Sequence, residues 1–281
     1  MQERNLLLER LGTALKYAIL IIGAIMMVFP FAWMIDASLM TSSEIQRRPP
    51  ALYPAEVQWQ NFTQLLDVLP FGRLYLNSLI VTISTVIGVL FTSSLAGFAF
   101  AKYQFPGREV LFYIILATMM IPFFVTLIPV FYIVRQLGWI DSYQGLILPS
   151  ITSAYGIFLM RQFIVSIPDE LIDAARIDGA PEPMIYWRII IPLTRPALAT
   201  LGTFVFIGSW NAFLWPLLVI NSRDLYTVPL GLNTLRTFAA EARNLNLLMS
   251  GTVLSVVPTL ILFIFLQRYF IQGITLTGLK G

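Results

Sequence analysis

Six long stretches of the chain contain no Asp, Glu, Lys or Arg. They run over Tyr17–Ile35, Leu74–Ala101, Val110–Val134, Ser142–Met160, Pro196–Ser222 and Asn244–Gln267, with lengths of 19, 28, 25, 19, 27 and 24 residues. A helix that crosses ~30 Å of hydrocarbon needs about 20 residues. Each stretch is therefore long enough for one crossing and too short for two. The pattern predicts six transmembrane helices, at about residues 17–36, 75–101, 110–134, 142–160, 197–221 and 246–267.

Two other interpretations of these stretches are disfavoured. Strands of a membrane barrel alternate apolar and polar residues over about 10 positions, whereas the run Ile-Leu-Phe-Ile-Phe-Leu at 261–266 does not alternate. The apolar region of a cleavable signal peptide has about 7–15 residues, and the first stretch has 19. The sequence therefore predicts an all-α membrane protein that retains its first helix.

Composition agrees with this class and removes several kinds of chemistry. Hydrophobic residues make up 57% of the 281-residue chain and charged residues 12%, against about 25% charged in soluble domains. The absence of Cys and His excludes thiolate and imidazole metal sites and Cys- or His-dependent nucleophilic catalysis. Apart from Asp36 at the outer end of the first one, the predicted spans carry no Asp, Glu, Lys or Arg, which disfavours transport coupled to ions or protons. Uphill transport would need energy from another subunit.

The distribution of Lys and Arg predicts the orientation. If the N-terminus lies inside, the inner segments hold 11 of the 18 Lys and Arg residues and the outer segments hold 7. Cytoplasmic segments are enriched in these residues. Both termini are therefore predicted to be cytoplasmic. The net charge of +3 suits contact with anionic lipid and gives no reason to expect nucleic acid.

The predicted spans contain proline as well as apolar residues. These prolines are Pro30, Pro122, Pro129, Pro149, Pro216 and Pro258. Proline removes a helical hydrogen bond and kinks the axis. The prolines either shape a central cavity or reflect ordinary packing irregularity, and for any single one the second interpretation is favoured.

The fifth predicted span contains a candidate substrate site. It holds Ser209, Asn211 and Trp215, and a site for sugars needs hydrogen-bonding groups beside an aromatic surface. Asn211 and Trp215 are four residues apart and would share one face of a continuous helix. The alternative is that Asn211 joins two helices while Trp215 faces lipid.

The longest inner segment, 161–195, predicts a helix-turn-helix. Ser166 is a good N-cap residue, and Asp169 and Glu170 suit the positive end of a helix. Gly179 can take the left-handed conformation that ends a helix. We therefore predict one helix over 167–178 and a second that begins at Pro181.

The spacing within this segment is specific. Asp173-Ala174-Ala175 is followed after three residues by Gly179 and, nine residues later, by Ile189-Ile190-Ile191-Pro192. This spacing resembles the loop motif E-A-A, three residues, G, nine residues, I-x-L-P of the permeases of binding-protein-dependent ABC importers. Two positions depart from the motif, because Asp173 replaces Glu and Ile191 replaces Leu.

Other parts of the chain resemble the carbohydrate branch of that family. They are the string Ile177 to Ala180, the segment from Trp210 to Pro216, and the C-terminal tail from Arg268 to Gly281. The resemblance implies the membrane-spanning permease subunit of an ATP-driven sugar importer in the bacterial inner membrane. It also implies a type I ABC importer fold, with residues 1–281 as a single permease domain.

The resemblance further implies partners and sites. The permease would pair with a second permease subunit as a heterodimer, two cytoplasmic ATPase subunits would bind below, and an external solute-binding protein would deliver sugar. ATP and Mg²⁺ would be bound by the ATPase subunits, and this chain would bind no cofactor and catalyse no reaction. The implied ATPase-coupling interface comprises Glu170, Asp173, Ala174, Ala175, Asp178, Gly179 and Ala180. Ala174 and Ala175 are small enough to allow close approach by a partner.

Two other functional classes fit the sequence less well. A passive solute channel or facilitator would also lack buried charge, but it has no need for the loop motif. A membrane-embedded enzyme would have little chemistry available without His, Cys or paired carboxylates in the spans. The chain has no G-x-x-x-x-G-K-[ST] phosphate loop, so it is not itself expected to bind ATP.

Overall fold

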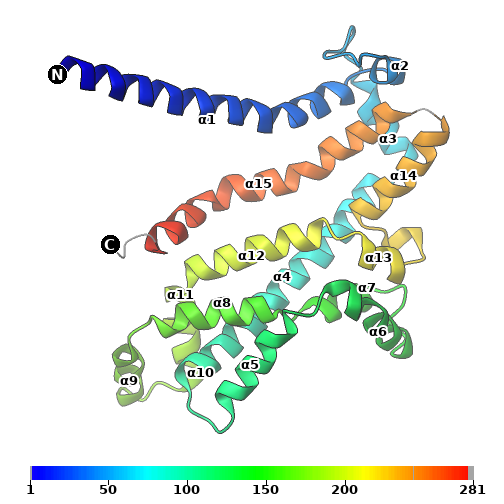
Figure 1. Cartoon of the computed structure of the whole chain (residues 1–281). Helices are drawn as coiled ribbons and strands as arrows, with labels where there is room; N and C mark the ends of the chain where they lie inside the picture. The colour runs from blue at the N-terminus through cyan, green and yellow to red at the C-terminus, as the bar shows by residue number, and fades with distance from the viewer. Residues whose placement is uncertain (1, 243, 278–281) are drawn as a thin grey trace. The chain divides into compact units, whose positions relative to one another are not determined.

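The computed structural model describes residues 2–242 and 244–277, which are almost entirely helical and contain no strand (Figure 1). The longer helices are α1 (Gln2–Ser38), α3 (Gln60–Val68), α4 (Phe71–Lys102), α5 (Arg108–Thr118), α6 (Phe123–Gln136), α8 (Ala154–Val165), α9 (Asp169–Ile177), α12 (Arg195–Trp210), α14 (Val228–Ala242) and α15 (Leu245–Thr277). The shorter ones are α2 (Ser42–Gln46), α7 (Tyr143–Ile147), η1 (Leu148–Ser150), α10 (Glu182–Ile185), the π-helical turn η2 (Tyr186–Ile190), α11 (Ile191–Leu193), α13 (Leu214–Val219) and η3 (Arg223–Leu225).

The chain forms two compact units. The first unit contains the chain up to Pro70 together with Leu232–Val256, and the second contains Phe71–Gly231 and the chain from Val257 onward. The prediction of a single permease domain stays a prediction. The tail from residue 278 to 281, part of the resemblance noted above, lies outside the described residues.

A polar network fastens α1 to α3 and to the start of α15 in the first unit. The Asn61 amide donates to the carbonyl oxygens of Ser38 and Met40, both at 2.9 Å. Its side-chain oxygen accepts a hydrogen bond from the Asn246 amide at 2.6 Å. Buried polar groups are costly unless they are hydrogen-bonded. The network therefore permits Asn61 to be buried and, in turn, fixes where α1 ends.

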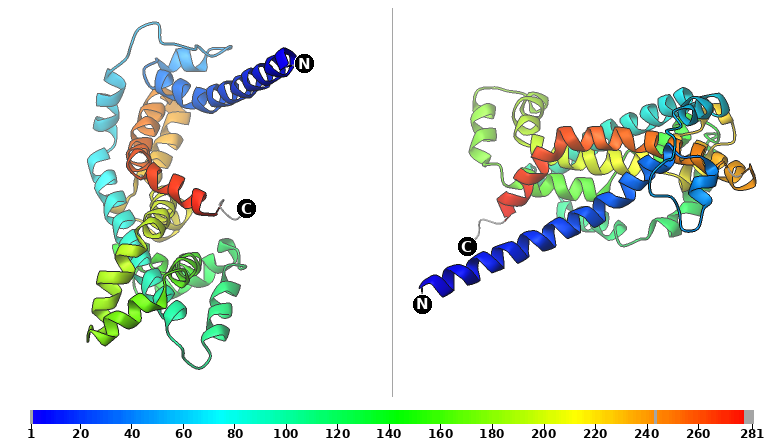
Figure 2. Two further views of the ribbon diagram at one scale, coloured as in Figure 1. Left: turned by 90° about the vertical axis from the view of Figure 1, so that its left-hand side faces the viewer. Right: turned by 90° about the horizontal axis from the view of Figure 1, so that it is seen from above.

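Within the described part of the first unit, most of α1 from Arg10 onward is uncovered. Within Arg10–Ser38, the most apolar 18-residue window is 0% buried, and Figure 2 shows α1 projecting away from α2 and α3. A helix that is apolar on all sides is not stable in water. Lipid or another subunit must cover α1.

The second unit is built around α4. This helix packs along α8 and α12, and it lies close to α8 at Gly97, where an added Cβ would lie 2.7 Å from Met160 Cβ. Small residues let membrane helices approach closely. The buried side chains around this contact include Met160, Ile164 and Leu201. The α4–α8–α12 packing is thus the core on which the rest of the unit is arranged.

Three of the predicted spans are interrupted. The span at 110–134 is divided between α5 and α6, which are bent by 100°. The span at 142–160 is divided among α7, η1 and α8, and the span at 197–221 is divided between α12 and α13. The expectation of continuous helices is therefore wrong in these three places.

Proline accounts for the positions of these breaks. Pro122 is the N-cap of α6, Pro149 is in the first turn of η1, and Pro216 is in the first turn of α13. Proline has no N–H to donate, which does no harm in a first turn but breaks a continuing helix. By contrast, Pro30 and Pro129 lie inside helices.

The described helices do not confirm the number of spans. Three helices are long and apolar enough to cross a membrane, namely Arg10–Ser38, Phe71–Lys102 and Leu245–Phe265. Two bent pairs, Arg108–Thr118 with Phe123–Gln136 and Glu182–Leu193 with Arg195–Trp210, raise the number to as many as five. A multi-pass helical membrane protein is confirmed, and the exact count of six stays a prediction.

Candidate functional site

α9 is an amphipathic helix with one open face. Ile172 is 2% exposed, and Ala175 packs against the same core. The opposite side, called the α9 face below, consists of exposed residues: Glu170, Leu171, Asp173, Ala174, Ile177 and Asp178. Ile177 is 87% exposed, which is unusual for a large apolar side chain next to carboxylates. A surface that mixes open apolar and acidic groups is suited to binding another protein.

The structure separates the predicted interface residues into two groups. Glu170, Asp173, Ala174 and Asp178 lie on the α9 face. Ala175 and Ala180 instead pack against the core of their own chain. The small size of Ala175 therefore serves the packing of α9 on this unit, and of the two alanines only Ala174 is exposed.

Gly179 makes the turn between the two helices of this segment. Its φ of 77° is left-handed, as the sequence predicts. The Gly179 amide donates to the Arg176 carbonyl at 3.0 Å, and the Ala180 amide donates to the Ala175 carbonyl at 2.9 Å. These bonds close α9 and direct the chain into α10.

The predicted start of α9 is wrong. The helix begins at Asp169 with Pro168 as its N-cap, not at 167 with Ser166 as the cap. Ser166 instead follows the last turn of α8, where its hydroxyl donates to the Phe163 carbonyl at 2.7 Å. Because α8 continues to Val165, Ser166 is the C-cap of that helix and its hydroxyl bonds there.

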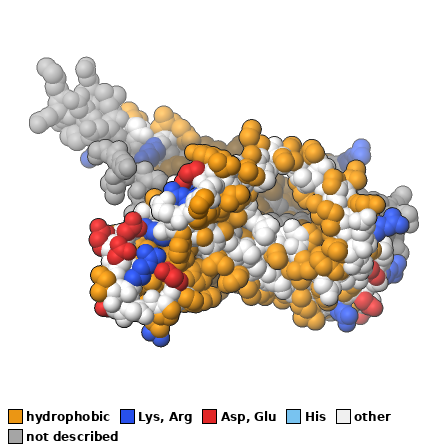
Figure 3. All heavy atoms as spheres, turned by 90° about the horizontal axis from the view of Figure 1, so that it is seen from below, with side chains coloured by type: hydrophobic (Ala, Val, Ile, Leu, Met, Phe, Trp, Pro, Cys, Tyr) orange, Lys and Arg blue, Asp and Glu red, His pale blue; other side chains and the backbone are white. Residues whose placement is uncertain are grey.

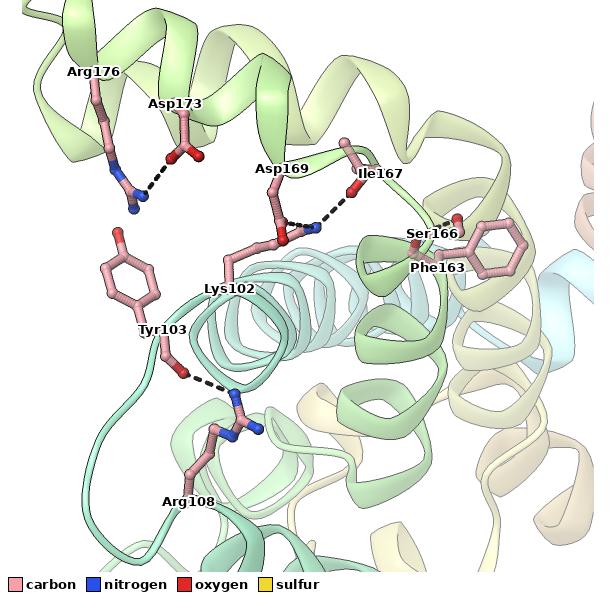
Figure 4. Close-up of polar contacts among 9 residues, drawn as sticks. All are labelled: Lys102, Tyr103, Arg108, Phe163, Ser166, Ile167, Asp169, Asp173 and Arg176. Carbon is pink, nitrogen blue, oxygen red and sulfur yellow. Dashed lines mark hydrogen bonds and ion pairs between the residues drawn. The ribbon is translucent and has the colours of Figure 1, made fainter.

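The start of α9 is tied to the end of α4 by Lys102 (Figure 4). The Lys102 ammonium donates to the Ile167 carbonyl at 2.5 Å and to the Asp169 carboxylate at 2.6 Å. Its side chain is only 5% exposed. A buried ammonium needs such partners, and its place in the last turn of α4 also suits the negative end of that helix.

The other end of α9 is tied to the next residue, Tyr103. Its hydroxyl donates to the Glu182 carboxylate at the start of α10. The same carboxylate accepts a hydrogen bond from Arg176 Nε at 2.9 Å. The Arg176 guanidinium carbon lies 5.8 Å from the centre of the Tyr103 ring. Lys102, the last residue of α4, and Tyr103, which follows it, thus contact opposite ends of α9.

The electrostatics of this cluster keep it intact at neutral pH. Burial, followed by the hydrogen bond to Glu182, raises the pKa of Tyr103 to about 12. The hydrogen bonds from Arg176 and then Tyr103 lower the pKa of Glu182. Tyr103 therefore remains a protonated donor, and Glu182 remains a charged acceptor.

A cavity of about 450 Å³ lies within the second unit and is called the α4 cavity below. Nine of its lining residues carry hydroxyl groups: Ser78, Thr82, Thr85, Thr126, Ser150, Thr152, Ser153, Ser209 and Thr227. Among the described residues that line it, none is Asp, Glu, Lys or Arg, and the rest are apolar. Such a wall can hydrogen-bond a neutral polar solute and offers no charge to an ion.

Two of these hydroxyls have no partner. Thr85 Oγ1 and Thr227 Oγ1 are buried without a hydrogen bond, and their residues are 4% and 5% exposed. Ser209 Oγ contacts Thr82 Oγ1 at 3.4 Å. A buried hydroxyl without a partner costs roughly 1–3 kcal/mol. Both residues line the α4 cavity, so a bound solute would lie close to them.

The three predicted pathway residues do not come together. Ser209 and Trp215 line the α4 cavity. Trp215 Nε1 already has a hydrogen-bond partner, because it donates to the Gly145 carbonyl at 3.0 Å. Asn211 is absent from the cavity wall and caps α12, where its amide donates to the Ile207 carbonyl at 2.8 Å. The shared face proposed for Asn211 and Trp215 is wrong, because the helix is interrupted between them.

Sequence reasoning missed the hydroxyls of α4. Ser78, Thr82 and Thr85 are spaced by four and three residues, which places them on one face of a helix. That spacing was a usable signal. It was weak, because Ser and Thr in membrane helices commonly bond a carbonyl one turn earlier. No local spacing pointed to Thr227, since it lies far from the residues of α4 in the sequence.

The distribution of charge on the second unit agrees with a membrane protein. Figure 3 shows a dense group of acidic and basic side chains at the end that carries α9 and α10, further charged side chains at the opposite end, and many hydrophobic side chains in between. Long apolar helices, a charge-free polar cavity and one open amphipathic helix together define a class. These features are typical of membrane transport components.

Comparisons with known proteins identify the family. The match to the family described as "Binding-protein-dependent transport system inner membrane component" covers residues 88–276. The arabinooligosaccharides transport system permease protein AraQ of Halalkalibacterium halodurans is 39% identical over 261 residues, which cover 92% of this chain and 93% of that protein. The sn-glycerol-3-phosphate transport system permease protein UgpE of Yersinia pestis is 32% identical over 264 residues, which cover 92% of this chain and 94% of that protein.

A solved structure has the same fold. The crystal structure of a bacterial ABC transporter involved in the import of the acidic polysaccharide alginate contains a chain that is 25% identical, with a TM-score of 0.83. The match covers 93% of this chain and 97% of that chain. The present chain belongs to the binding-protein-dependent transport system inner membrane component family. It is a multi-pass, non-catalytic permease subunit of the inner membrane, which confirms the predicted class and fold.

Proposed function

We propose that this permease subunit passes an uncharged oligosaccharide along the α4 cavity, driven by an ATPase that docks on the α9 face. The observation that carries the proposal is the cavity wall, which has nine hydroxyls and no charge among the described residues. Sugars present hydroxyls around apolar ring faces, so this wall complements them. The wall favours a neutral solute over an anionic one such as sn-glycerol 3-phosphate, because no cation faces the space.

The proposal includes the partners that ATP-driven import requires. These are a second permease subunit in a heterodimer, two ATPase subunits and an external solute-binding protein. We infer that ATP and Mg²⁺ are held by the ATPase subunits and that this chain binds no cofactor. The family description, which names a binding-protein-dependent transport system, supports the external solute-binding protein. A neighbour of the same fold is an alginate transporter in complex with a pentasaccharide-bound periplasmic protein (TM-score 0.63, 16% identical). A passive channel would have no need for an open α9 face.

Removing the two unpartnered hydroxyls tests the cavity. A hydrogen bond is worth about 0.5–1.5 kcal/mol, so Thr85→Val with Thr227→Val is expected to reduce uptake roughly tenfold. Uptake is measured in proteoliposomes with the cognate solute-binding protein and a panel of labelled neutral oligosaccharides, with sn-glycerol 3-phosphate as the anionic comparison. The matched control is Thr118→Val, whose exposed hydroxyl donates to the Ile115 carbonyl outside the cavity.

The same pair of substitutions separates a binding role from a structural one. Valine has nearly the shape of threonine, and removing an unpartnered buried hydroxyl does not destabilise a chain. The double variant should therefore keep wild-type thermal stability while uptake falls. Unchanged uptake in the double variant, or faster uptake of the anionic compound by the wild type, would contradict the proposal.

The proposed orientation places both termini and α9 in the cytoplasm. The chain has no Cys, so single-cysteine variants can be labelled without background. Glu56 and Ser166 are exposed and serve as the two positions. A membrane-impermeant thiol reagent applied to intact spheroplasts should label Glu56→Cys and leave Ser166→Cys unlabelled until the membrane is permeabilised. Labelling of Ser166→Cys from outside would reverse the orientation.

A further inference from the structure

We infer that Lys102 and Tyr103 are positioning residues that make α9 move together with α4, so that movement of a docked ATPase reaches the cavity through one helix. The inference rests on the proposed function, in which the ATPase binds the α9 face and the solute occupies the α4 cavity. It concerns what joins those two sites.

Two adjacent residues, Lys102 and Tyr103, hold α9 at both of its ends. Lys102 contacts the Ile167 carbonyl and Asp169, on either side of the N-cap of α9. Tyr103 contacts Glu182, which in turn holds Arg176 in the last turn of α9. A helix fixed at one end can pivot about that point. With contacts at both ends, α9 is constrained against rotation relative to α4.

The contacts of Lys102 are shielded from water, and those of Arg176 join ionised groups. The Lys102 side chain is 5% exposed, so water does not compete strongly for its ammonium. Arg176 has a second carboxylate nearby, with Nη1 at 3.4 Å from Asp173. Hydrogen bonds between ionised groups are about twice as strong as neutral ones. The contacts are therefore stronger than neutral hydrogen bonds at the same positions would be.

α4 is continuous from the cavity to the point where α9 is attached. It is an unbroken helix of 32 residues without an internal proline, unlike the interrupted segments that contain α5–α6 and α12–α13. Ser78, Thr82 and Thr85 on this helix line the cavity. Lys102 lies 17 residues beyond Thr85, or about 26 Å along a helix that rises ~1.5 Å per residue. One stiff element thus carries both cavity hydroxyls and the attachment of α9.

Apolar packing of α9 could hold it without these contacts, because Ile172 and Ala175 also face the core. The test must therefore remove the polar contacts and leave that packing in place. Lys102→Met keeps most of the aliphatic side chain and removes the ammonium. Tyr103→Phe keeps the ring and removes the hydroxyl. Controls of the same types are Arg188→Met and Tyr113→Phe, both at exposed positions.

The measurement is the amount of solute taken up per ATP hydrolysed, with both quantities read from the same proteoliposomes. The solute is the neutral oligosaccharide that the wild-type complex takes up fastest in the panel above. Lys102→Met with Tyr103→Phe should retain bound ATPase and ATP hydrolysis. Uptake per ATP should fall by about fivefold or more, the lower end of typical couplings between sites. The controls should keep the wild-type ratio.

Two outcomes would overturn the inference. One is a wild-type ratio of solute taken up to ATP hydrolysed in both the double variant and Tyr103→Phe alone. The single variant is the milder change, and it keeps the test available if Lys102→Met fails to fold. The other is loss of bound ATPase, because the contacts would then shape the docking surface instead of transmitting movement. Failure of the proposed function is distinguishable, since in that case the wild-type complex would show no ATP-dependent uptake at all.

Discussion

Replacing Gly97 by alanine is expected to lower the free energy of unfolding by roughly 1–3 kcal/mol, the usual cost of overpacking. A Cβ at this position would lie 2.7 Å from Met160 Cβ and 2.9 Å from the Arg161 amide nitrogen. The second of these is a backbone atom, so it can yield only if α8 moves away from α4. Larger side chains such as leucine should prevent the protein from accumulating in the membrane.

Gly72→Ala is the matched control for this prediction. Gly72 lies on the same helix, and a Cβ there would meet nothing within 4 Å. Thermal denaturation of the purified protein in detergent compares the two variants. The close packing of α4 on α8 would not be the basis of the core if Gly97→Ala and Gly72→Ala melted at the same temperature as the wild type.

Replacing Ala174 by tryptophan is expected to weaken association with the ATPase by at least about tenfold, which corresponds to about 1.4 kcal/mol. Ala174 is exposed on the α9 face, so a large side chain there does not disturb the packing of this chain. It would instead occupy space that a docked partner needs. Copurification of the ATPase with a tagged permease measures the effect.

Ala175→Leu provides the contrast. Its side chain packs against the core of its own chain, so the larger residue should lower thermal stability before it affects docking. The pair therefore distinguishes a binding surface from a packed one on the same helix. If Ala174→Trp retains the ATPase at the wild-type level, α9 is not the docking helix.

Local sequence patterns predicted the parts of the structure that depend on near neighbours. The left-handed turn at Gly179 was predictable because a helix commonly ends in a left-handed residue, and glycine, which has no Cβ, adopts that conformation most easily. The position of α9 was predicted to within a few residues, because acidic residues and proline mark a helix start wherever the chain lies. Its exact start was missed, since α8 extends to Val165 and takes Ser166 as its cap.

The predicted substrate residues show the limit of such patterns. Asn211 and Trp215 were placed on one face because the span was assumed to be a continuous helix. The interruption between α12 and α13 removes that relation, and Trp215 donates its N–H to Gly145 from a distant segment. Pro216 in the sequence marked the break, but its effect depended on whether neighbouring helices could satisfy the freed backbone groups.

By itself, the sequence determined the class of protein, its apolar segments and the loop motif of 173–192. These follow from the distribution of charge and from local spacing, which act over a few turns of helix. Only the tertiary structure decided which hydroxyls face one cavity and which side of α9 stays open. Thr85 and Thr227 line the same space although they are 142 positions apart in the chain. Contacts at such separations depend on how whole helices pack, and no local pattern of residues encodes them.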